Sequence, residues 1–136
     1  MVKISIDYEG GLHCVAAHEP SGNQVPTDAP VDNEGKGEAF SPTDLVGAAL
    51  GTCMATTMAI VARRKGVELD GTTVDVGKEM SADAPRRIAK LTVKILVPLA
   101  ADHPEKEVIE AAARGCPVAR SLDPSVEVPL EIVWSG

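Results

Sequence analysis

The amino-acid sequence predicts an α+β fold, in which helices are segregated from antiparallel sheets. Two observations favour this class. Several short segments alternate apolar and polar residues as strands do, and neighbouring segments of this kind are separated by turns rather than by helices. The length of 136 residues suits one domain with a core of its own, so we expect a single domain over residues 1–136.

The N-terminal segment predicts a β-hairpin followed by a long loop. Residues 2–8 alternate apolar and polar side chains, Gly10 and Gly11 make a turn, and residues 12–17 can return as the second strand. Residues 18–39 are rich in Pro, Gly, Asp, Asn and Glu, and we interpret them as a loop. Loops of this length inside a domain are usually functional or disordered.

A long helix is predicted over residues 42–65. Ser41 is suited to cap its N-terminus, Asp44 completes an acidic form of the capping box, and Gly66 is suited to the left-handed residue that ends it. Residues 45–62 carry no charge. A helix without charge on any face is buried on most sides, so we expect a second copy of the chain to help cover it.

The C-terminal half predicts three strands and a second helix. Residues 72–80 and 87–98 read as strands, and residues 104–114 place their apolar side chains on one helical face. Cys116 and Pro117 can open a further helical turn, because proline suits the first position of a helix. Residues 126–134 alternate as the last strand.

The net charge of −7 argues against a nucleic-acid partner, since binding to phosphates depends on Lys and Arg. We expect no membrane span, and no apolar run that approaches the roughly 20 residues that one requires. The N-terminus lacks the apolar region of a signal peptide. Three cysteines is an odd number, so reduced thiols and a cytoplasmic location are expected.

Two of the cysteines suggest thiol redox chemistry as the first hypothesis. Cys53 lies within the long uncharged helix, where a cysteine is usually a small buried apolar side chain. Cys116 lies at the start of a helical turn, where unpaired N–H groups favour the thiolate. On these grounds Cys116 is expected to be the better activated thiol. Cys14 lies in a predicted strand and is expected only to pack.

The chain resembles the OsmC/Ohr family, named for osmotically inducible protein C and organic hydroperoxide resistance protein. The similar residues are FSPTDL at 40–45, ALGTC at 49–53, RKGV at 64–67 and AARGCPV at 112–118. The resemblance extends from about residue 40 to residue 134, and the two cysteine motifs at this separation are together fairly specific.

This resemblance implies an intertwined α+β homodimer, in which sheets from both chains wrap around two long central helices. It also implies reduction of organic hydroperoxides, with Cys53 as the peroxidatic thiolate and Cys116 as the resolving thiol. The thiolate would become a sulfenic acid and then a disulfide with the second cysteine. A dithiol, lipoyl-type in members of this family, would restore the thiols by exchange, and no cofactor, metal or flavin is implied.

Two positions depart from the pattern of the hydroperoxide-resistance members. Thr43 stands where those members have a Glu, and Asp44 is the nearest carboxylate. Those members also use an Arg from the N-terminal half, whereas the first arginine here is Arg63. Lys36 and His18 are the cations of the predicted loop that could substitute for it. Without that arginine, Cys53 is expected to have a higher pKa and to react slowly.

Two other functions remain open at this stage. A non-catalytic member of the family would keep the dimeric scaffold and act as a stress protein or bind a small molecule. A general disulfide reductase or redox sensor would use the same cysteines with another substrate. The departures favour the first of these, while retention of both cysteines favours a thiol reaction.

Overall fold

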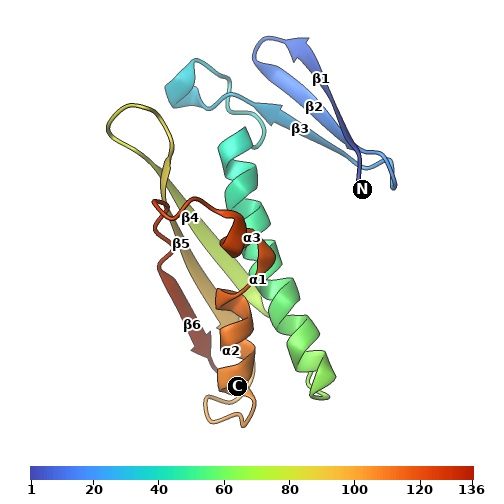
Figure 1. Ribbon diagram of the computed structural model, residues 1–136, viewed down its shortest axis with the longest axis vertical. Coiled ribbons are helices and arrows are strands. Elements are labelled where there is room, and N and C mark those ends of the chain that lie inside the picture. Colours follow the sequence, from blue (N-terminus) through green and yellow to red (C-terminus); the bar gives the residue numbers. More distant parts are fainter. The chain divides into compact units, whose positions relative to one another are not determined.

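The computed structural model describes residues 1–136, which divide into two units, Met1–Val46 and Gly47–Gly136. Figure 1 shows the helices and strands of each unit. The elements in chain order are β1 (Ile4–Gly10), β2 (His13–His18), β3 (Gln24–Asp28), the 3₁₀ helix η1 (Val31–Asn33), α1 (Pro42–Arg64), β4 (Thr73–Met80), β5 (Ile88–Val97), α2 (Lys106–Arg114), α3 (Pro117–Ser121) and β6 (Leu130–Trp134).

The N-terminal unit contains an antiparallel sheet with the strand order β1-β2-β3. The predicted hairpin is present, but the prediction of a continuous loop over residues 18–39 was wrong, because β3 and η1 lie inside it. Pro26 occupies the middle of β3, opposite Val15 of β2. Proline is tolerated there because β3 is an edge strand, whose outward N–H groups need no partner in the sheet.

The apolar side chains of β1 are exposed in the single chain. Ile4, Ile6 and Tyr8 retain 62%, 65% and 65% of their accessible surface. The alternation that predicted a half-buried strand is therefore present, but its apolar face is not covered. Exposed apolar side chains grouped on one strand face are typical of an interaction surface.

The start of α1 has the predicted capping box. The Ser41 N–H donates to Asp44 Oδ2 at 2.9 Å, and the Asp44 N–H donates to Ser41 Oγ at 3.0 Å. These two bonds satisfy N–H groups that have no partner within the helix. At the other end, Gly66 has a φ of 73°, the left-handed conformation that ends helices. The helix ends at Arg64, one residue before the predicted position.

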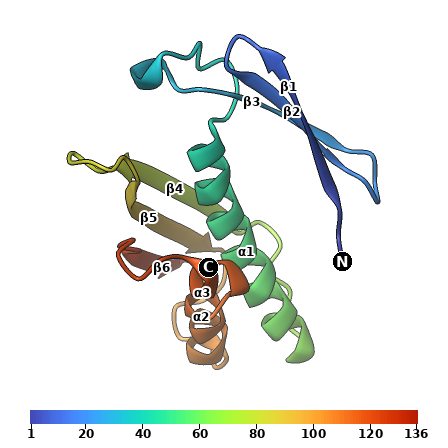
Figure 2. The ribbon, with the colours of Figure 1, turned by 45° about the horizontal axis from the view of Figure 1, so that its top comes forward.

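The C-terminal unit contains the sheet β4-β5-β6, with α1 and α2 on one face (Figure 2). β5 has the predicted alternation, because Leu91, Val93, Ile95 and Val97 are all at most 1% exposed. The intervening residues of β5 point to the opposite face, where Leu96 is 37% exposed. One face of the sheet thus forms the core of this unit.

Two glycines allow α1 to lie close to the sheet. A Cβ at Gly51 would be 2.9 Å from Val76 Cγ2 and 3.3 Å from Val74 Cγ1, both on β4. A Cβ at Gly47 would be 3.5 Å from Val76 Cγ1. The first of these separations is shorter than packed carbon atoms adopt, so this part of α1 requires glycine. Close packing at Gly51 sets the depth at which the next turn of α1 sits against β4.

The strand β6 pairs with β5 in parallel, in the register Val93↔Leu130 to Val97↔Trp134. The expectation of antiparallel sheets therefore holds for β1-β2-β3 and for β4 with β5, and was wrong for β6. Parallel neighbours need a crossover connection, usually helical, and α2 and α3 provide it here. Trp134 Nε1 donates to Glu110 Oε1 at 2.8 Å, which ties β6 to α2.

The helix α1 is long and apolar enough to cross a membrane by length and composition, so the expectation that no apolar run approaches this length was wrong. Core helices of globular proteins share these properties. In this chain Leu50, Met54 and Met58 are at most 1% exposed. The opposite face of α1 is open, with Ile60 48% exposed, so the single chain buries one face rather than most sides.

We expect Gly51→Val to lower the free energy of unfolding by about 1–3 kcal/mol, because the added carbons collide with the valines of β4. The control is Gly77→Val on β4, where a Cβ meets nothing within 4 Å and a β-branched residue suits the strand. Urea denaturation at one fixed protein concentration compares the two variants. Equal midpoints for Gly51→Val and the wild type would contradict the close packing.

Candidate functional site

Cys53 lies in the middle of α1, one residue before the buried Met54. Its side chain is half-buried and its thiol is free. The Cys53 sulfur is 3.9 Å from the hydroxyl oxygen of Thr57, which lies one turn further along the helix. Because residues four apart share a helix face, the two side chains lie on the same side of α1.

Cys116 is the N-cap residue of α3, as predicted, with an extended backbone at φ −64° and ψ 149°. Its sulfur accepts a hydrogen bond from the Ala119 N–H at 3.4 Å, and Pro117 occupies the first helical position. The side chain has no exposed surface. The cap thus uses a thiol where serine or aspartate is more usual.

The structure brings Cys53 and Cys116 together within the C-terminal unit. The Cys116 thiol and the backbone N–H of Val118 lie close enough to the Cys53 sulfur to lower its pKa. α3 therefore lies against the middle of α1 (Figure 1). The start of α3 thus lies near both sulfurs, and its Ala119 N–H donates to the Cys116 sulfur.

The two thiols differ in acidity. Burial raises the pKa of the Cys53 thiol. Hydrogen bonds from the Val118 N–H, the Cys116 thiol and the Thr57 hydroxyl outweigh burial, so this pKa lies below its ordinary value. At Cys116, burial raises the pKa, and hydrogen bonding to Cys53 together with the charge on that sulfur raises it further. The Ala119 N–H opposes this rise without cancelling it.

Two expectations about these thiols are thereby corrected. Cys116 is not the better activated thiol, because complete burial outweighs the N–H group at its cap. Cys53 does not have a raised pKa, because neutral hydrogen-bond donors stabilise its thiolate. Neither burial nor the approach of α3 to α1 is visible in the sequence.

The other residues that the sequence suggested lie in the N-terminal unit. Asp44 is engaged in the capping box, and the Thr43 and Ser41 hydroxyl oxygens are 3.1 Å apart. His18 Nδ1 is 2.6 Å from Ser21 Oγ. Supporting roles for Asp44 and Lys36 in thiol chemistry stay predictions.

Lys36 lines a small hollow of about 280 Å³ in this unit. In the hollow, Asp28 is hydrogen-bonded to His13, with Asp28 Oδ1 2.6 Å from His13 Nδ1, and accepts the Glu38 N–H at 3.0 Å. The bond to His13, with a weaker contribution from the charge of Lys36, lowers the pKa of Asp28. Lys36 therefore has a carboxylate neighbour in its own unit.

Thr57 and Val118 are site residues that the sequence reasoning missed. The spacing of four residues between Cys53 and Thr57 was a usable signal, because it places both on one helix face. For Val118, the signal was its position just after the predicted cap, where N–H groups lack helical partners. Cys14 lies half-buried on β2 with a free thiol. No group of three or more His, Cys, Asp or Glu side chains is arranged to hold a metal ion.

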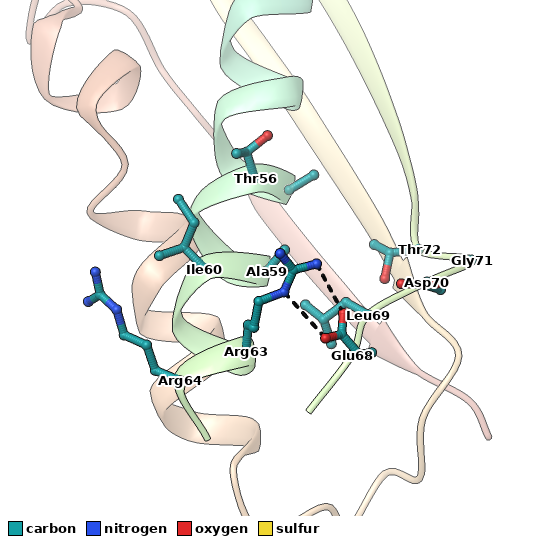
Figure 3. A pocket seen from close by; sticks show the side chains of 11 residues that line it. Thr56, Ala59, Ile60, Arg63, Arg64, Glu68, Leu69, Asp70, Gly71 and Thr72 are labelled. Carbon is teal, nitrogen blue, oxygen red and sulfur yellow. Dashed lines mark hydrogen bonds and ion pairs between the residues drawn. The ribbon is translucent and has the colours of Figure 1, made fainter. Parts of the chain in front are cut away.

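A second hollow, of about 620 Å³, lies beside the C-terminal half of α1 (Figure 3). Its floor is mainly apolar, and Arg63 is directed at Glu68, with Nε 3.3 Å from Oε1. No cysteine or histidine lines it, so it offers binding surface rather than reactive groups. Its lining residues are Ala55, Thr56, Ala59, Ile60, Arg63, Arg64, Glu68, Leu69, Asp70, Gly71 and Thr72.

Comparison with known proteins identifies similar sequences and folds. The family model described as OsmC-like protein matches residues 35–131. A crystal structure from Psychrobacter arcticus 273-4, provisionally described as an osmotic stress induced and detoxification response protein, is 41% identical. It has a TM-score of 0.90, and the match covers 97% of this chain and 96% of that one.

More distant structures share the fold. An organic hydroperoxide resistance protein OsmC from Legionella pneumophila is 18% identical with a TM-score of 0.78, covering 98% of this chain and 96% of that one. The organic hydroperoxide resistance protein OhrB of Bacillus subtilis is 18% identical with a TM-score of 0.73, covering 97% of each chain. Among curated proteins, none matches this chain.

We expect Cys53 to be alkylated by iodoacetamide at lower pH than Cys116, because the thiolate is the reactive form and a lowered pKa preserves it as pH falls. Near pH 7 Cys53 should therefore be alkylated faster than Cys116. Peptide mass spectrometry after timed labelling measures both rates. In guanidinium the two rates should converge, and faster labelling of Cys116 in the native protein would contradict the assignment.

Proposed function

Because the chain belongs to the OsmC-like family, we propose that it reduces organic hydroperoxides through a thiol cycle at Cys53 and Cys116. The family and its hydroperoxide-resistance members support a role in redox chemistry or peroxide resistance. One observation carries the finer proposal: the two thiols lie close enough to affect each other's pKa, and these pKa values are shifted in opposite directions. Such a pair offers a nucleophile and a protonated partner beside it.

In the first step, the Cys53 thiolate attacks the terminal oxygen of the hydroperoxide, the one that carries the hydrogen. An S–O bond forms as the O–O bond breaks, leaving a sulfenic acid on Cys53 and an alkoxide that takes up a proton to become an alcohol. The sulfur is oxidised by two electrons and the peroxide is reduced by two. The lowered pKa of Cys53 suits this step, because the thiolate is the attacking species.

In the second step, the Cys116 sulfur attacks the sulfenic sulfur. An S–S bond forms, and the sulfenic oxygen leaves as water with the Cys116 proton. A dithiol then reduces the disulfide by two thiol exchanges and is itself oxidised to a disulfide. The mutual effect of the two thiols on their pKa values supports this step, because it requires the resolving sulfur to lie near the sulfur that it attacks.

We also propose that the active form is a homodimer and that residues 1–136 act as one OsmC-like domain. Two apolar surfaces support a dimer: the exposed face of β1 and the face of α1 around Ile60, which borders the larger hollow (Figure 3). The family match over residues 35–131 crosses the boundary between the units, which supports one domain. A cytoplasmic location fits a cycle that starts from reduced thiols.

The second candidate function is binding of a small apolar molecule without catalysis. The hollow beside α1 favours it, because about 620 Å³ lies within the range of small-molecule sites and its floor is mainly apolar. This function does not require Cys53, so a cysteine variant separates the two candidates. A disulfide reductase or redox sensor would require both cysteines but not a peroxide.

We expect Cys53→Ser to lose consumption of cumene hydroperoxide in the presence of dihydrolipoamide, leaving only the rate of the dithiol alone. Cys14→Ser is the matched control and should retain the wild-type rate, since Cys14 lies in the other unit. Peroxide remaining is measured over time. Equal turnover by the wild type and Cys53→Ser would favour the binding function.

A homodimer should have twice the mass of the 14.2 kDa chain in light scattering. Ile60→Glu should shift the mass toward the monomer, because it places a charge on the open apolar face of α1. The matched control is Leu96→Glu, on the face of β5 that points away from the helices. A monomeric wild type at micromolar concentration would contradict the proposed dimer.

A further inference from the structure

Thr57 differs from Thr52, another threonine of α1 near Cys53 in the sequence, in what its hydroxyl contacts. Threonine in a helix commonly donates to a backbone carbonyl one turn earlier. Thr52 does so, because its hydroxyl donates to the Ala48 carbonyl at 2.8 Å and the Ala49 carbonyl at 3.2 Å. The Thr57 hydroxyl oxygen instead lies 3.9 Å from the Cys53 sulfur.

The position of Thr57 suits a donor to a charged sulfur. A hydroxyl can donate one proton, and a thiolate can only accept, so ionisation of Cys53 fixes the direction of this hydrogen bond. Both side chains are half-buried, so water competes less for the sulfur than at an exposed site. The Val118 N–H at the start of α3 also lies close enough to the Cys53 sulfur to lower its pKa.

We propose that Thr57 is a further residue of the thiol site, whose hydroxyl donates to the Cys53 thiolate and, with the Val118 N–H, stabilises its charge through neutral donors. The biological purpose of this interaction rests on the proposed function. The test does not, because it measures the acidity of Cys53 directly. Stabilisation of the thiolate, which the sequence suggested for a cation within residues 18–39, is thus assigned to a side chain of α1.

Neutral donors predict a distinct dependence on salt. An ion pair between a thiolate and an exposed cation is screened as salt increases, which raises the pKa of the thiol. Hydrogen bonds from a hydroxyl and a backbone N–H carry no net charge to be screened. The pKa of Cys53 should therefore change little when salt is raised from low concentration to about 1 M, where the screening length is about 3 Å.

The test is the pH dependence of Cys53 alkylation in four proteins: wild type, Thr57→Val, Thr57→Ser and Thr52→Val. Valine keeps the shape of threonine and removes the hydroxyl, whereas serine keeps the hydroxyl. Iodoacetamide labelling followed by peptide mass spectrometry reports Cys53 separately from the other cysteines. Circular dichroism confirms that each variant is folded, and Thr57→Ala replaces Thr57→Val if valine disturbs the helix.

We expect Thr57→Val to raise the pKa of Cys53 by about one pH unit, which lowers its thiolate fraction near pH 7 about tenfold. Thr57→Ser should restore the wild-type profile, and Thr52→Val should leave it unchanged. A Thr57→Val profile that coincides with the wild type, or an equal shift in Thr52→Val, would overturn the inference. So would a rise of the wild-type pKa by a unit or more in high salt, which would identify a cation as the stabilising group.

These readings use no peroxide, so the inference and the proposed function fail separately. A wild type that leaves cumene hydroperoxide untouched removes the peroxidase proposal while the Thr57 shift can still be measured. Conversely, an active wild type with no Thr57 shift removes only the role of the hydroxyl.

Discussion

The close packing of α1 on β4 is the constraint on which the C-terminal unit depends. Gly51 lies against Val74 and Val76 at separations that leave no space for a side chain. With the helix seated at this depth, Leu50, Met54 and Met58 fill the space above the sheet. Cys53 then lies at the edge of that core and is half-buried. At such a position protein groups can stabilise the thiolate, and a substrate can still reach the sulfur.

The start of the short helix α3 lies near both sulfurs of the site. Cys116 is the cap residue and accepts the N–H of Ala119, while the preceding N–H, of Val118, lies near enough to the Cys53 sulfur to lower its pKa. The same arrangement makes the thiols unequal, since Cys116 is enclosed and Cys53 is not. Asymmetry between two otherwise identical groups is what allows one to act as a nucleophile and the other as its partner.

Much of the fold could be predicted from local sequence signals. The capping box at Ser41 and the glycine at 66 gave the bounds of α1 to within one residue, and the alternation in residues 87–98 identified the core face of β5. β3 was not predicted, because a proline at position 26 argues against a strand, whereas an edge strand tolerates it. The parallel pairing of β6 was missed because strand direction is decided by how α2 packs, not by the strand's own residues.

The two cysteines of the site could be predicted from the sequence, but their relative pKa values could not. The motifs around Cys53 and Cys116 singled out both cysteines, and the contact between them depends on tertiary structure alone. The prediction that Cys116 is the more acidic thiol was wrong. The sequence Cys116-Pro117 indicates the cap of α3, but it does not indicate that the Cys116 side chain is buried. Burial decides the outcome at Cys116, and neutral donors decide it at Cys53.

The parallel pairing of β6 also restrains the crossover that carries Cys116. Trp134 pairs with Val97 on β5 and donates to Glu110 on α2, so the crossover that carries Cys116 is anchored by the last strand. The segment that presents Cys116 is therefore held on both sides, by β5 before it and by β6 after it.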